Sequence, residues 1–285
     1  MRRFQAIAVL ATFLLPLAAF ASTLCIPGTV EEILADGMIV TLPGTGGDMY
    51  AYTFNVFVDC ETHTLVYCTG MTVYLCFPAV YEQGPNIESE EVVWILNNYY
   101  PAVPGMPGGF TTDDERASAV QLALWHFTDG LDISGPGSGT PLNVFDAARA
   151  IILAAETAVV PPTPTSMVLA TTWLLPAVEI AATLFDQNGV VMPGVLISWS
   201  GAVNGSGTTD ESGQVVVPAW TWTLGDAITF DVDYTIPIGL SWVLPGCQDL
   251  IQGVEVAGNV TATWAESPPA GAAPATWGRI KSLYR

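Results

Sequence analysis

The chain changes its residue pattern once, at the Pro-rich segment "VVPPTPTS" of residues 159–166. Before this segment, runs of aromatic and β-branched residues are interrupted by three stretches with helical spacing. After it, only alternating segments separated by Gly, Asn and Asp turns follow, at a spacing that suits an immunoglobulin-like sandwich. We therefore expect an α+β domain over residues 22–160, a linker over 161–167 and an all-β sandwich over 168–265.

The first domain contains three stretches that predict helices. The stretch "SEEVVWILNNYYP" has Ser89 as a candidate N-cap, with acids in the first turn. The stretch "TTDDERASAVQLALWHFTDG" begins with Thr112 and Glu115 at capping-box spacing and ends at Gly130, which suits a C-terminal stop. The stretch "NVFDAARAIILAAETA" predicts the third helix, with Asn143 as its candidate cap.

Both ends of the chain differ from its body. Residues 1–21 combine a basic start, an apolar run and the small residues "AFA", which predicts a signal peptide that is cleaved before Ser22. Residues 266–285 form a low-complexity spacer followed by a short basic tail. No second apolar run is long enough for a membrane span, so we expect a secreted or cell-surface protein without a span in its mature chain.

The body of the chain is strongly acidic. The formal net charge is −20, and the only basic side chains between Ser22 and Trp277 are Arg116 and Arg149. Such a surface repels nucleic acid and anionic lipid, so neither is expected as a partner. Because this region contains no lysine, it offers no internal side-chain amine that can attack an electrophile.

The chain has five cysteines, and export favours their pairing in disulfides. They are Cys25, Cys60, Cys68, Cys76 and Cys247. The odd number leaves one cysteine without a partner in the chain. The sequence has no C-x-x-C spacing and only two histidines, His63 and His126, so it supports no zinc site and we expect no cofactor.

The second predicted helix carries a carboxamide, Gln121, inside its apolar pattern. A buried amide without hydrogen-bond partners costs about 1–3 kcal/mol, so this side chain needs partners if it is buried. From the helix pattern alone, Gln121 is expected at the edge of the apolar stripe, where it bonds a neighbouring strand. Other stretches of the chain suggest a different role.

The stretches "LVYCTG", "VVWILNNYYP" and "ASAVQLALWHFTDG" occur in this order, and together they resemble the bacterial thioester domain, a secreted surface-adhesion module. The resemblance covers roughly residues 28–160, and the segment around Gln121 is its most specific part. It implies a β-sandwich or barrel with a helical insertion. It also implies that a cysteine sulfur joins the Gln121 side-chain carbonyl with loss of ammonia, which gives an internal thioester.

The resemblance leaves two cysteines as candidates for this bond. Cys68 follows Tyr67, in keeping with the aromatic or leucine residue of the family pattern, but has Thr69 where an apolar residue is usual. Cys76 keeps an apolar follower, Phe77, but lies nearer the first predicted helix. If Cys68 forms the thioester, the other four cysteines are an even set that can form two disulfides of unknown connectivity.

The resemblance implies covalent adhesion. A thioester carbonyl is a better electrophile than an amide, so an amine would attack the Gln121 carbonyl and release the Cys68 thiolate. The expected partner is a protein or another amine-bearing surface. The reaction occurs once per molecule, so we expect a covalent binder and not an enzyme. The strands after residue 167 resemble immunoglobulin-like modules of bacterial surface proteins, which act as stalks.

Further side chains complete the candidate site. Trp125 is expected in the core, where it shields the bond from water, and Tyr67 and Trp94 are expected to line the cleft. His126 is a candidate proton acceptor for the incoming amine. It directly follows Trp125, however, and so projects from a different face of the helix than Gln121.

Two rival interpretations remain open at this point. In the first, Cys68 and His126 form a hydrolase or transglutaminase-like site, and activity would survive Gln121→Ala. In the second, the chain is a structural exported protein without a reactive bond, and Gln121 is an ordinary buried amide.

Overall fold

The computed structural model describes residues 22–43, 47–135, 140–159, 161–174, 177–221, 223 and 225–265. The predicted signal peptide and the C-terminal spacer and tail lie outside the described residues. The chain divides into two compact units. Among the described residues, the first unit comprises 22–159 and 235–256, and the second comprises 161–234 and 257–265.

The second unit differs from the continuous sandwich over 168–265 that the sequence pattern predicts. Thr235–Val256 packs with the first unit instead. The expected linker over 161–167 is also shorter than predicted, because a strand begins at Pro164. Alternation looks the same along the whole of a long strand, so the local pattern does not reveal which core each part of that strand enters.

The first unit is built on strands whose pairings close into a ring. Its strands are β1 (Thr23–Ile26), β2 (Leu34–Thr41), β3 (Asp48–Val58), β4 (Thr62–Cys68), β5 (Ala79–Gln83) and parts of β11 (Ala227–Val243) and β12 (Leu250–Ala265). The order is β12-β4-β3-β1-β5-β11, and β11 also pairs with β12, while β2 pairs with β3 outside this path. Of the expected β-sandwich or barrel, this closed strand order is that of a barrel.

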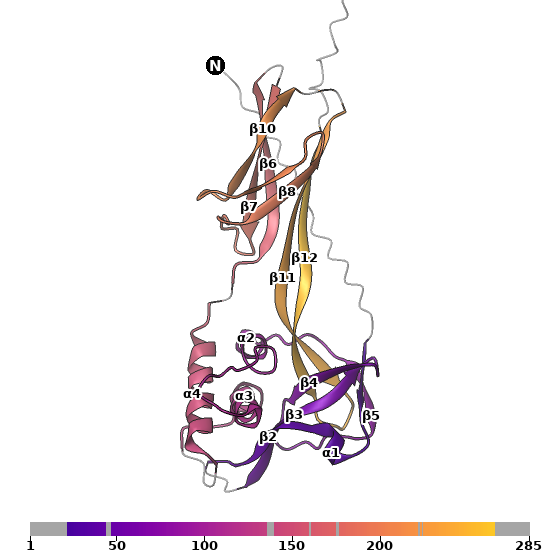
Figure 1. Ribbon diagram of the computed structural model, residues 1–285, viewed down its shortest axis with the longest axis vertical. Helices are drawn as coiled ribbons and strands as arrows, with labels where there is room; N and C mark the ends of the chain where they lie inside the picture. Colours follow the sequence, from indigo (N-terminus) through magenta and orange to yellow (C-terminus); the bar gives the residue numbers. More distant parts are fainter. Residues whose placement is uncertain are drawn as a thin grey trace, which may run out of the picture. The chain divides into compact units, whose positions relative to one another are not determined.

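Three helices are inserted between β5 and the second unit. They are α2 (Glu90–Asn98), α3 (Asp113–Asp129) and α4 (Leu142–Glu156), and the short α1 (Val30–Ile33) precedes β2. Helix α3 lies between α4 and strands β2 and β3 (Figure 1). None of the helices in the described residues is long and apolar enough to cross a membrane.

The residues that the sequence predicts to cap the helices do so in α2 and α3, but not at the start of α4. Ser89 and Thr112 accept backbone N–H groups of their own first turns, and Gly130 ends α3 in the left-handed conformation. The prediction for Asn143 is wrong, because α4 begins at Leu142 and places the asparagine inside its first turn. There the Asn143 amide donates to the Glu115 carboxylate at 3.4 Å, so its hydrogen bond joins two helices.

Helix α3 is covered on every side over most of its length. All residues from Ala117 to Trp125 are buried. A helix that is enclosed in this way has no polar edge along that stretch. Gln121 therefore lies in the interior, with none of its surface exposed, and not at the edge of an apolar stripe as the helix pattern alone predicts.

The second unit is all-β in its described residues. One sheet contains β6 (Pro164–Leu174), β7 (Ala177–Asp186) and β10 (Gln214–Thr221). In the other sheet, β8 (Leu196–Gly201) pairs with β11, and β9 (Gly205–Thr208) pairs with β8. Side chains from both groups of strands share one hydrophobic core, which includes Trp199. The shared core is the arrangement of a β-sandwich.

Candidate functional site

Cys68 is the one free cysteine among the described residues. The other four form the disulfides Cys25–Cys60 and Cys76–Cys247. Cys76, the alternative cysteine for a thioester, is therefore already bonded. Cys68 is the last residue of β4, where it pairs with the first residue of β12, and only 3% of its surface is exposed.

The side chain of Gln121 reaches the backbone of Cys68 from helix α3. Its Nε2 donates a hydrogen bond of 2.9 Å to the Cys68 carbonyl oxygen. Its Oε1 accepts from the Cys68 backbone N–H at 3.2 Å and lies 3.4 Å from the Cys68 Sγ. The backbone of Cys68 thus forms a hydrogen bond with each polar atom of the buried carboxamide. These bonds offset the free-energy cost of burying an unpaired amide.

This geometry brings together the groups that acyl transfer needs. The Cys68 backbone N–H points at Gln121 Oε1, the atom that gains negative charge when a nucleophile adds to the side-chain carbonyl. The Cys68 thiol is the nucleophile beside that carbonyl. Cys68 therefore supplies both the sulfur and a donor for the developing oxyanion.

The ionisation of the thiol is dominated by its burial. Loss of solvent raises the pKa of Cys68 from 9.0 to about 12. Hydrogen bonding from the side chains of Trp125 and Gln248 acts in the opposite direction, whereas the negative charge of Asp129 adds to the increase in pKa. A thiolate is thus costly at this position, and donors next to the sulfur are its main stabilisation.

Trp125 lies one helical turn after Gln121, so the two side chains project from the same face of α3. The indole ring is buried, as the sequence predicts. Its N–H has no hydrogen-bond partner within the part of the chain that the structure describes. Trp125 and Cys68 border the same cavity, and the indole lowers the pKa of the Cys68 thiol.

A cavity of about 700 Å³ gives access to Cys68. Trp125 and Gln248 line it together with the cysteine, and other walls come from α1, from β3 and from the segment after β4. Gln121 is not among the lining residues, so Cys68 is the member of the pair that borders the cavity. A nucleophile that enters the cavity therefore meets Cys68 before it reaches the glutamine carbonyl.

Residues 69–78, which we name the wall segment, follow Cys68 and form one side of this cavity. The Met71 N–H donates to the Asp129 carboxylate at the end of α3, at 2.7 Å. The Tyr74 carbonyl accepts from the Gln248 N–H in the β11–β12 connection, at 3.0 Å. A disulfide joins the wall segment to the same connection. Two distant parts of the chain thus hold the wall segment in place.

Sequence reasoning missed these supporting residues. Thr128 and Asp129 lie at the end of α3, and Thr128 donates to the Thr69 carbonyl at 2.5 Å. Sequence reasoning gave Gln248 no role, because no local pattern links that residue to a cysteine far earlier in the chain. The neighbouring Cys247 was the only indication that this region returns to the first unit.

The structure does not bring a histidine to Cys68. His126 Nδ1 lies 2.9 Å from the Leu131 carbonyl oxygen, so Nδ1 carries the hydrogen and the ring is turned to the helix end. His63 Nε2 lies 2.7 Å from Asn55 Oδ1. Neither is among the residues that line the cavity at the cysteine. In the described part of the chain, no group of side chains is suited to a metal ion.

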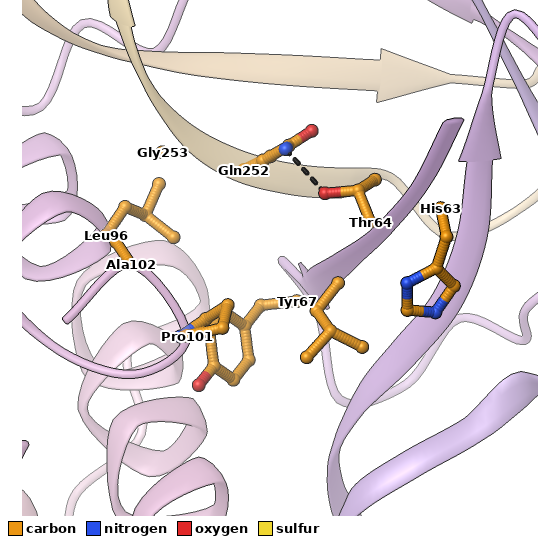
Figure 2. A pocket seen from close by; sticks show the side chains of 9 residues that line it. His63, Thr64, Tyr67, Leu96, Pro101, Ala102, Gln252 and Gly253 are labelled. Atoms are coloured by element: carbon orange, nitrogen blue, oxygen red, sulfur yellow. Dashed lines mark hydrogen bonds between the residues drawn. The ribbon is translucent and has the colours of Figure 1, made fainter. Parts of the chain in front are cut away.

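Tyr67 and Trp94 do not line the cavity at the cysteine either. Tyr67 directly precedes the cysteine on β4, so strand alternation turns it to the other face. It lies there beside Pro101 in a second cavity of about 320 Å³ (Figure 2). Its hydroxyl donates to the Tyr100 carbonyl at 2.8 Å. Trp94 packs edge-on against Tyr99, with 5.5 Å between the ring centroids.

Comparisons with known proteins agree with this architecture. The family model of the thioester domain matches residues 50–157, which include Cys68 and Gln121. A search of curated proteins finds no match. Among solved structures, the thioester domain of the Enterococcus faecium TIE86 protein is 10% identical, with a TM-score of 0.52 over 92% of this chain and 99% of that chain.

A second structure, the Bacillus anthracis TIE protein, is 9% identical with a TM-score of 0.51. The match covers 86% of this chain and 49% of that one, so it spans about half of the longer protein. At these identities the likeness is one of fold. Residues 50–157 thus match the thioester domain, and an all-β unit follows them.

Proposed function

We propose that Cys68 and Gln121 form an internal thioester, through which the protein attaches covalently, once per molecule, to an amine on a target surface. The observation that carries this proposal is the pairing of the buried Gln121 carboxamide with the N–H, the carbonyl and the sulfur of Cys68. The match of the surrounding residues to the thioester domain supports the same chemistry.

Bond formation exchanges an amide for a thioester. The Cys68 sulfur adds to Cδ of Gln121, and negative charge moves to Oε1, opposite the Cys68 backbone N–H. The carbon–nitrogen bond then breaks, and the side-chain nitrogen leaves as ammonia with the proton of the thiol. Gln121 has no exposed surface, which limits the access of water to the carbonyl and favours survival of the bond once it has formed.

Attachment reverses the roles of sulfur and nitrogen. The amine of the target adds to Cδ of Gln121, the carbon–sulfur bond breaks, and the proton lost by the amine is taken up by the Cys68 sulfur. The products are an amide between Gln121 and the target, and a free thiol. Trp125 borders the same cavity as Cys68 and lowers the pKa of its thiol, so the indole favours the departing thiolate that burial disfavours.

The rest of the chain supports action at a surface. The predicted signal peptide would export the protein, and the all-β unit would present the thioester domain to its target. No lysine lies between Ser22 and Trp277, so no lysine side chain in this region competes with the amine of the target. A protein or another amine-bearing surface is the partner that this chemistry requires.

The proposal is tested by the intact mass of the mature protein before and after treatment with methylamine. We expect a mass that is short by one ammonia, which methylamine converts to an adduct of one methylamine. Gln121→Ala and Cys68→Ala should each have the full calculated mass and form no adduct. Cys76→Ala is the control, because that cysteine is bonded to Cys247, and it should retain the adduct.

A full mass in freshly prepared protein, with no methylamine adduct, would remove the covalent mechanism. Turnover of a small ester or amide that survives Gln121→Ala would instead favour the hydrolase or transglutaminase alternative.

A further inference from the structure

The cavity at Cys68 is bordered by large apolar side chains that reach the surface. We name these side chains the apolar rim: Met49, Tyr50, Met71, Val73, Tyr74 and Phe77. Tyr74 exposes 90% of its surface, Tyr50 57% and Val73 46%. Apolar side chains exposed together at the mouth of a cavity are typical of a contact surface for a partner.

The charges around the cavity have one sign. Asp48 is the one charged residue among those that line it. Glu31 and Glu32 lie in the first turn of α1, which contributes another wall. The cations of the described residues are Arg116 and Arg149, and each is paired with an aspartate of its own helix. A nucleophile therefore approaches through an apolar opening whose lining holds one carboxylate and no cation, with two further carboxylates on α1.

We propose that the apolar rim selects the nucleophile: it binds an amine carried beside an apolar or aromatic group, with no carboxylate next to the amine. This inference rests on the proposed function. The apolar group of the target packs against the rim, and the nearby carboxylates attract the protonated amine but repel an anionic neighbour. Binding at the rim holds the amine at the thioester and so increases the rate of the bimolecular step.

The inference is tested with three small amines: methylamine, phenethylamine and phenylalanine. Phenylalanine has the side chain of phenethylamine, but its amine adjoins a carboxylate. The second-order rate of thioester opening is followed by release of the Cys68 thiol, and each rate is divided by the rate of the same amine with a small-molecule thioester. One methylene in an apolar pocket changes such rates by roughly 10–200-fold, so we expect phenethylamine to exceed methylamine by at least about tenfold. Phenylalanine should lose most of that advantage.

Val73→Asp tests the surface itself, because it places a charge on the rim without touching Cys68 or Gln121. We expect it to abolish the preference for phenethylamine while methylamine still reacts. Ile39→Asp is the matched control, since Ile39 exposes 50% of its surface and is not among the residues that line the cavity. It should keep the preference. If Val73→Asp loses the methylamine reaction as well, Tyr74→Ser replaces it with the same readout.

The outcomes separate the two proposals. A protein that forms the methylamine adduct, but reacts with all three amines in the ratios of the small thioester, overturns selection by the rim and leaves the proposed function standing. Equal loss of preference in Val73→Asp and Ile39→Asp also overturns it. A protein of full mass that forms no adduct overturns the proposed function, and selection by the rim falls with it.

Discussion

Gln121 is a polar side chain at a fully buried position, and the backbone of Cys68 makes that position tolerable. The Gln121 carboxamide donates to the Cys68 carbonyl and accepts from the Cys68 N–H. It thus forms the two hydrogen bonds that the backbone of a paired strand would form. The sulfur of Cys68 then lies against the amide without further adjustment. The contacts that satisfy the amide are thus the contacts that align it for reaction with the thiol.

Trp125→Phe should slow the opening of the thioester by methylamine. The variant keeps an aromatic ring in the core but removes the indole N–H, the donor through which Trp125 lowers the pKa of the Cys68 thiol. A hydrogen bond to a charged group contributes about 1.5–3 kcal/mol, which corresponds to roughly a 10- to 150-fold lower rate. Trp94→Phe is the control, because Trp94 does not line the cavity at Cys68. Equal rates in wild type and Trp125→Phe, at equal thioester content, would contradict this role.

The thiol itself should titrate far above an ordinary cysteine. In Gln121→Ala no thioester forms, and burial keeps the pKa of Cys68 well above 9.0. Since the raised pKa leaves the neutral thiol dominant, alkylation by iodoacetamide should be slow at neutral pH and should still be rising as the pH passes 9.0. A rate that levels off near or below that value would show that the sulfur is not desolvated as the structure has it.

At the scale of elements, local patterns predict the helices well and the surroundings of the reactive pair poorly. The first turns at Ser89 and Thr112 and the stop at Gly130 follow from side chains within a few positions of one another. The wall segment depends on Gln248 and on Cys247, which no short-range pattern connects to it. The sequence alone also left Cys68 and Cys76 open, because their pairing is a property of the tertiary structure.

Removal of the disulfide that holds the wall segment should shorten the lifetime of the thioester in water. Cys76→Ser combined with Cys247→Ser frees one side of the cavity at Cys68, so water should reach the bond more often. We expect several-fold faster hydrolysis, followed by intact mass over time. Cys25→Ser with Cys60→Ser removes a disulfide whose cysteines do not line this cavity, and its hydrolysis rate should stay near that of wild type. Equal acceleration in both pairs would indicate a general loss of stability instead.

At the scale of the whole molecule, the first unit is discontinuous in sequence. Thr235–Val256 supplies the parts of β11 and β12 that pair with β5 and β4. The pattern change near residue 160 predicts where the first continuous piece ends, but not that a later hairpin returns to complete the barrel. Strand pairing over such a separation depends on the tertiary core and leaves no trace in the alternation of either strand.

A fragment of residues 22–160 should therefore fail to fold on its own. It lacks the partners of β4 and β5, so two strand edges and part of the core would be open to water. We expect no cooperative thermal unfolding and no methylamine adduct from this fragment, whereas residues 22–265 should show both. A folded fragment with an intact thioester would contradict the requirement for the returning hairpin.

The return of this hairpin also sets an order of events during synthesis. Cys68 and Gln121 are both translated long before Asp249, whose carbonyl accepts the Thr69 N–H beside the cysteine, and before Leu250, which pairs with the cysteine itself. Until that late segment emerges from the ribosome, the thiol and the amide lack part of their enclosure. We therefore expect the thioester to form late in synthesis, after most of the second unit has been translated.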